Sequence, residues 1–134
     1  AWKAVLSNKG ILPLLWQRNV GHPNLLEAHF DDGSALASGW VRKPLFSREG
    51  ANIEMHLADG SVQRSDGPYD GPAILQKAHP LTRFEGGYPL IGSWVIGDHA
   101  CGIGIREDDS AITRDSARFV PHAIVDEAPT RIYV

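Results

Sequence analysis

The residues whose types and spacing most clearly suggest chemistry lie in segment 40–52. The pattern predicts a strand that ends near Lys43, a loop that carries Arg48 and Gly50, and a second strand from Ile53. Small residues let backbone N–H groups approach a polyphosphate closely, and a guanidinium binds phosphate through two parallel hydrogen bonds. The loop therefore suits phosphate recognition. The alternative is a solvated hairpin turn, because exposed basic turns commonly have no measurable role.

A second candidate cation, Arg106, follows the apolar segment 101–105. Isoleucines alternate there with the small residues Gly102 and Gly104, a pattern that predicts a buried strand. Arg106 stands where the chain turns polar. It is suited to bind an anion there, or it is the last exposed residue of the strand.

Other groups of polar residues give weaker indications of metal binding or catalysis. Three adjacent acids, 107–109, indicate a solvated turn, because Mg²⁺ sites usually draw on separated carboxylates and phosphate oxygens. His99 and Cys101 alternate onto one strand face, but no third group orients them, so we expect a half-buried cysteine without a catalytic role. No metal ligand is predicted in this chain. Trp16, Trp40 and Trp94 are expected to anchor the core.

Short helices and then short strands must position these side chains. The apolar pattern of 2–17, broken near Asn8, predicts two short helices, and Asn24 is expected to cap another short helix through Phe30. The predicted strands cover 39–45, 52–57, 61–64, 73–77, 88–96 and 99–106, with a last strand-like piece around Phe119 and an extended end at 129–134. Asp59–Gly60 and Gly97–Asp98 mark hairpin turns.

The order of these elements indicates an α+β fold with mostly antiparallel pairing, because no long helix separates consecutive strands. The 134 residues, 43% hydrophobic and 22% charged, suffice for one domain. Gly86 and Gly87 are the expected internal boundary. The apolar pattern begins abruptly at Trp2, so we expect a fragment of a longer protein.

Charge and cysteine content limit the partners. A net charge of −3 without a basic block argues against general nucleic-acid binding. Cys101 is the only cysteine, which excludes an internal disulfide and suits a reducing compartment. No apolar run approaches the roughly 18 residues of a membrane span, so no membrane partner is predicted and the cytoplasm is the expected location.

Six sequence blocks together resemble the C-terminal part of the glutathionylspermidine synthase family. They are residues 2–9, 12–16, 40–44, 48–53, 91–97 and 102–107. The blocks occur in the family's order and extend the resemblance from Trp2 to about His122. Such ordered agreement is far more specific than one glycine-rich loop.

The resemblance implies an ATP-grasp fold, in which two α+β subdomains clamp ATP, and a ligase that joins a carboxylate to an amine through an acyl phosphate. Residues 1–134 would be the C-terminal portion of that domain, with helices and the nucleotide-covering sheet in 1–85 and a hairpin and C-terminal segment in 86–134. The implied partners are ATP and small-molecule carboxylate and amine substrates. The family's Mg²⁺ ligands are expected in an upstream segment without a counterpart here, so the chain alone should be inactive. Homo-oligomerisation stays open.

The resemblance also implies roles at individual positions. Lys9 and Lys43 would neutralise nucleotide phosphates, and Arg106 would act at the phosphate-transfer centre. The remaining nucleotide contacts would come from the mobile phosphate-covering loop at Arg48, Glu49 and Gly50, from the adenine-facing strand end at Gln76, Lys77 and Ala78, and from Ile112 and Thr113. We expect Lys43, Arg48 and Gln76 to line one cleft, with Lys9 nearby and Arg106 reaching it from the second hairpin.

Two alternatives remain beside this interpretation. One is a non-enzymatic α+β module that binds a nucleotide or a protein. The other is a related ligase for amino acids or peptides, because a fold does not fix a substrate.

Overall fold

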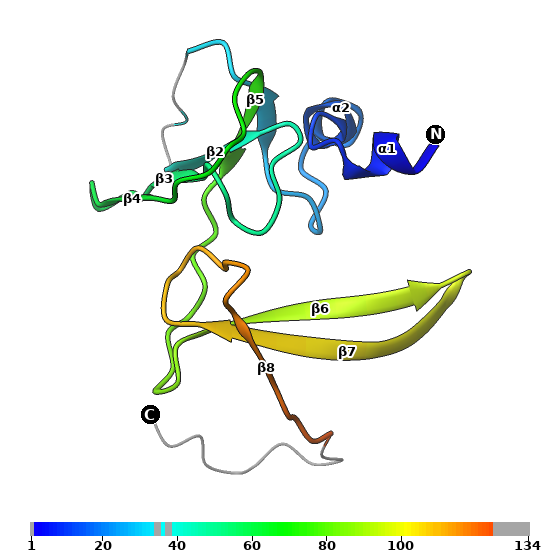
Figure 1. Cartoon of the computed structure of the whole chain (residues 1–134). Helices are drawn as coiled ribbons and strands as arrows, with labels where there is room; N and C mark the ends of the chain where they lie inside the picture. The colour runs from blue at the N-terminus through cyan, green and yellow to red at the C-terminus, as the bar shows by residue number, and fades with distance from the viewer. Residues whose placement is uncertain (1, 34–35, 37–38, 125–134) are drawn as a thin grey trace.

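The computed structural model describes residues 2–33, 36 and 39–124, so the extended end expected at 129–134 lies outside the described residues. Two short helices precede two antiparallel sheets (Figure 1), which confirms the α+β fold class. The helices are α1 (Trp2–Ser7) and α2 (Ile11–Arg18). The first sheet has the order β1-β5-β2-β3-β4, built from β1 (Ala28–Phe30), β2 (Trp40–Pro44), β3 (Glu54–His56), β4 (Val62–Arg64) and β5 (Ala73–Lys77). The second has the order β6-β7-β8, built from β6 (Tyr88–Ile96), β7 (His99–Asp108) and β8 (Arg118–Val120).

The helical segment divides where the sequence predicted. The Asn8 side chain accepts a hydrogen bond from the Gly10 N–H at 2.8 Å, in the turn between α1 and α2. Pro13 lies in the first turn of α2, where the missing N–H costs no helical hydrogen bond. Helix α2 contacts β1 and lies on that side of the first sheet (Figure 1). Among the described residues, no helix is both long and apolar enough to cross a membrane.

The helix predicted from Asn24 through Phe30 is wrong. Residues 28–30 form β1, which pairs with β5 in the register Ala28↔Gln76 and Phe30↔Ile74. Ala28 is fully buried there, and the Asp31 N–H extends the pairing by donating to the Ala73 carbonyl at 3.1 Å. Pairing with the edge of β5 satisfies more of the backbone than one short helical turn would, so the tertiary contact overrides the local pattern.

The core joins the first sheet to the chain that follows β7. Its buried cluster consists of Val41, Ile53, Met55 and Ile112. Val41 belongs to β2, Ile53 to the loop before β3 and Met55 to β3. Ile112 comes after the long hairpin. The β6–β7 hairpin itself projects away from the first sheet (Figure 1), which leaves Trp94 61% exposed. The expectation that Trp94 anchors the core is therefore wrong, and Cys101 on the same hairpin is exposed instead of half-buried.

Gly50 is a point of close approach between the two halves of the chain. Its φ is +72°, and a Cβ at this position would lie 2.5 Å from the Thr113 carbonyl oxygen and 3.1 Å from Cγ2 of Ile112. No side chain fits in that space, so the loop after β2 packs against 112–113 only because residue 50 is glycine.

Replacing Gly50 with alanine should therefore destabilise the protein more than the same change at Gly60. Gly60 has a similar φ of +84°, but no atom lies within 4 Å of the position that a Cβ would occupy. Gly60→Ala thus carries only the left-handed backbone penalty of about 1 kcal/mol. Gly50→Ala adds a steric clash, and we expect a total loss of about 2–4 kcal/mol. Urea unfolding of both variants measures the difference. Equal losses would contradict the close approach.

Candidate functional site

A cavity of about 300 Å³ lies between the first sheet and the segments on either side of the long hairpin. Its lining comes from β2, β3 and β5, from the loop at Gly50, from β6 and from residues 111–113. The polar and charged lining residues include Lys43, Gln76, Lys77, His79 and Thr113, and the apolar ones include Met55, Leu81, Leu90 and Ile112. No acidic residue is among the described residues that line it. The cavity is therefore chemically suited to an anion.

Strand register brings Lys43 and Gln76 together. Lys43 is paired with Ile74, so Gln76, two residues along β5, is its diagonal neighbour on the same face. The Lys43 ammonium donates to the Gln76 side-chain oxygen at 2.7 Å. Burial lowers the pKa of Lys43, and the nearby charge of Lys9 lowers it further. The site thus holds a partly desolvated cation that a bound anion would stabilise.

Lys9 extends this positive region from the turn between the helices. Its backbone N–H donates to the Leu45 carbonyl at 2.9 Å, and its ammonium donates to the Ser47 carbonyl. Burial lowers the pKa of Lys9, with a further contribution from the Arg48 charge. Lys9 therefore lies close enough to both Lys43 and Arg48 for their like charges to repel. An anion would relieve that repulsion.

The structure places most of the other predicted nucleotide contacts at this cavity. Gly50, Lys77, Ile112 and Thr113 line it directly. Arg48 and Glu49 are exposed on the loop, and Glu49 instead faces a second, open depression on the other side of Gly50.

The strand end that was expected to contact adenine is already hydrogen-bonded within the protein. The Lys77 N–H donates to the backbone carbonyl of Glu27 at 2.8 Å, and the Ala78 N–H donates to that of Gly39 at 3.1 Å. Ala78 also packs against the buried cluster. These two N–H groups are thus occupied, whereas His79 and Leu81 follow directly and line the cavity.

Arg106 lies beside the cavity but does not line it. It is paired across the hairpin with Leu90, which is a lining residue, and on its other side with Phe119 of β8. Paired residues of antiparallel strands point to the same face, so Arg106 shares the face of Leu90. The side chain is half-buried, and no described residue forms a hydrogen bond or ion pair with it.

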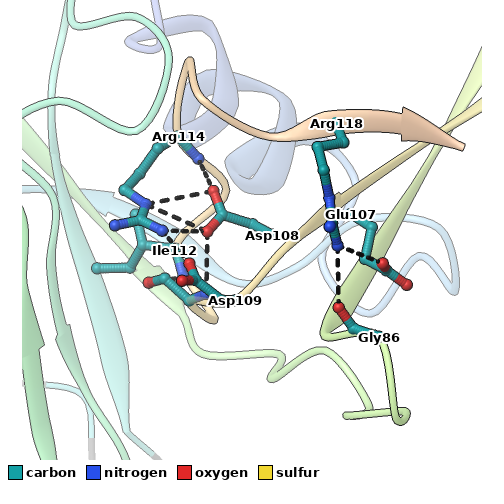
Figure 2. A network of polar contacts seen from close by, with 8 residues as sticks. Gly86, Glu107, Asp108, Asp109, Ile112, Arg114 and Arg118 are labelled. Carbon is teal, nitrogen blue, oxygen red and sulfur yellow. Dashed lines mark hydrogen bonds and ion pairs between the residues drawn. The ribbon is translucent and has the colours of Figure 1, made fainter.

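The acidic turn at 107–109 differs from the solvated turn that was expected. Asp108 is buried, and its carboxylate accepts hydrogen bonds from the Ser110 N–H at 2.9 Å and the Arg114 N–H at 2.8 Å. The Arg114 guanidinium also binds Asp108 and Asp109 (Figure 2). It holds the pKa of the Asp108 carboxyl well below its ordinary value, and Asp108 in turn raises the pKa of Arg114. Only Asp109 is exposed as predicted.

Glu107 forms a separate ion pair. Its carboxylate binds Arg118 at 2.9 Å, and the same guanidinium donates to the Gly86 carbonyl at 3.3 Å (Figure 2). Within the described part of the chain, no three His, Cys, Asp or Glu side chains converge as a metal site would require.

The fold is α+β, and the cavity has the lysines Lys43 and Lys77 and no acid among the described residues that line it. The chain belongs to the glutathionylspermidine synthase family: the family model described as glutathionylspermidine synthase preATP-grasp matches residues 1–125. This confirms the resemblance drawn from the sequence.

Three relatives show how much of a longer protein this chain matches. It is 42% identical over 134 residues to the Haemophilus influenzae protein named "Putative acid--amine ligase", covering 93% of this chain and 34% of that protein. It is 39% identical over 115 residues to trypanothione synthetase of Crithidia fasciculata, covering 84% of this chain and 18% of that protein. It is 27% identical over 172 residues to glutathionylspermidine synthase of the same organism, covering 96% of this chain and 24% of that protein. The chain thus spans about a third or less of the length of these relatives.

Proposed function

We propose that this chain is the nucleotide-binding part of an ATP-dependent ligase that joins a carboxylate to an amine. The observation that carries the proposal is the cavity in which Lys43 and Gln76 meet with no acidic residue among the described lining. The names of the relatives, an acid–amine ligase, a synthetase and a synthase, support the same reaction class.

The cavity offers two kinds of surface to a nucleotide. Lys43 supplies positive charge for the polyphosphate, with Lys9 close to it and Arg48 close to Lys9. Apolar side chains such as Met55 and Leu90 suit the flat face of a base. The Gln76 oxygen is held by Lys43, which leaves the amide nitrogen as a donor for the ligand.

The proposed reaction has two steps. A carboxylate oxygen of the acyl donor attacks the γ-phosphorus of ATP, the bond to the bridging oxygen breaks, and ADP leaves with an acyl phosphate formed. The amine then attacks the acyl carbon, loses a proton and displaces phosphate. Positioning and neutralisation of charge supply most of the catalysis in phosphoryl transfer, and Lys9, Lys43, Arg48 and Arg106 are suitable for both.

The described residues do not fit a magnesium site. Glu107 and Asp108 are bound by Arg118 and Arg114, and none of the described cavity-lining residues is acidic. As the family resemblance implies, we propose that the Mg²⁺ ligands lie in an upstream segment of the protein.

The substrate class follows the names of two relatives, glutathionylspermidine synthase and trypanothione synthetase. We propose a peptide carboxylate such as that of glutathione as acyl donor and a polyamine such as spermidine as acceptor. A ligase for amino acids or other peptides is the alternative, because fold does not fix substrate. We expect the reaction in the cytoplasm, where the exposed Cys101 would stay reduced.

The change Lys43→Ala should weaken nucleotide binding, with Arg42→Ala as its matched control. Both residues lie on β2, but Arg42 points to the other face and binds Asp31 at 2.6 Å. Loss of a charged hydrogen-bond donor should raise the Kd for a non-hydrolysable ATP analogue about 10- to 100-fold in Lys43→Ala. Arg42→Ala should stay within about 2-fold of wild type, since its side chain does not line the cavity. Calorimetry on the full-length protein measures both. Equal effects would contradict the site.

Arg106 should affect turnover more than nucleotide affinity. If its guanidinium meets the transferring phosphoryl group, Arg106→Ala should lower kcat by about 10³-fold, with a smaller effect on the KM for ATP. Arg106→Lys should remain severely impaired, because lysine keeps the charge but loses the planar fork. ADP release that depends on glutathione and spermidine measures this. Near-normal kcat and KM in a folded Arg106→Ala variant would make Arg106 an ordinary strand-end residue.

A further inference from the structure

We propose that Asp108 and Arg114 are positioning residues that hold one wall of the nucleotide cavity in place. The proposal rests on the proposed function. Neither side chain lines the cavity, and both would act through the segment 110–113 between them.

The Asp108 carboxylate closes this segment into a fixed loop. It accepts hydrogen bonds from the backbone N–H of Ser110 at one end and of Arg114 at the other, at 2.9 and 2.8 Å. Within the loop, the Ile112 N–H donates to the Ser110 hydroxyl at 3.2 Å. A buried carboxylate thus organises the backbone of the residues that follow β7.

The same loop forms the wall. Ile112 is buried in the core cluster, and both Ile112 and Thr113 line the cavity. The Thr113 carbonyl lies against Gly50, so the loop also limits where the segment after β2 can lie. A shift of 110–113 would move two walls of the cavity together.

Arg114 compensates the negative charge of the buried Asp108 carboxylate. Its guanidinium binds Asp108 at 2.5 Å and also reaches the exposed Asp109. The Asp108 side chain is 1% exposed, whereas that of Arg114 is 44% exposed. Removing Arg114 would leave the buried carboxylate without its counter-charge. Arg114 and Asp108 should therefore act as one unit.

The adjacent Glu107–Arg118 pair provides a matched control. It has the same chemistry, but it connects β7 to β8 and to Gly86 and makes no hydrogen bond to 110–114 (Figure 2). A change there should lower stability without moving the cavity wall.

The test compares Asp108→Asn, Arg114→Met and Arg114→Lys with Glu107→Gln in the full-length protein. Binding of a non-hydrolysable ATP analogue is measured by calorimetry on folded protein, beside Tm. We expect Asp108→Asn and Arg114→Met to raise the Kd at least about 10-fold, with Arg114→Lys recovering part of the loss. Glu107→Gln should lower Tm but keep the Kd within about 2-fold. If Asp108→Asn does not fold, Arg114→Met carries the test, because it retains the two backbone hydrogen bonds to Asp108.

Each result decides the proposal. Folded Asp108→Asn or Arg114→Met protein with a wild-type Kd would overturn the positioning role while the proposed function stands. An equal rise of Kd in Glu107→Gln would also overturn it, because general destabilisation would then explain the effect. Wild-type protein that binds no nucleotide would overturn the proposed function, and the positioning role with it.

Discussion

The close packing of Gly50 against the Thr113 carbonyl is the constraint on which the rest of the structure depends. It brings the loop after β2 into contact with the segment after β7, residues more than sixty positions apart in the chain. Ile112 enters the core of the first sheet at the same place. Because both halves meet here, the cavity has walls from each: Lys43 of β2 lines it together with Leu90 of β6 and Ile112.

The positive charges at this site oppose folding. Burial and mutual repulsion lower the pKa of both Lys43 and Lys9, which means that each ammonium is less stable in the folded chain than in water. Asp108, also buried, has its own arginine, whereas the described lining of the cavity gives the lysines no carboxylate. Ionisable groups held in an unfavourable environment are typical of functional sites, where a ligand supplies the missing charge.

Local sequence signals predicted the fold well where contacts are local. The break at Asn8, the strand at 73–77 and the Asp59–Gly60 turn all occur as expected. The segment 25–30 was misassigned because β1 exists through pairing with β5, more than forty residues away. Trp94 was misassigned for a related reason: an apolar residue in a strand pattern indicates burial only if something covers that face.

The site could be predicted in part. Strand register explains why Lys43 and Gln76 lie close together, and the family resemblance named both residues. The Asp108–Arg114 pair was missed, because three adjacent acids indicate solvent unless the turn brings an arginine back onto them. Asp108 itself was a local signal of that turn, because an aspartate side chain commonly accepts a hydrogen bond from the backbone N–H two residues later.

The most direct test of the central claim is a crystal structure of the full-length protein with a non-hydrolysable ATP analogue. The polyphosphate should lie within hydrogen-bonding distance of the Lys43 ammonium, and the base should lie against the apolar wall that includes Leu90 and Ile112. An analogue bound elsewhere, with Lys43 contacting only Gln76, would contradict the account.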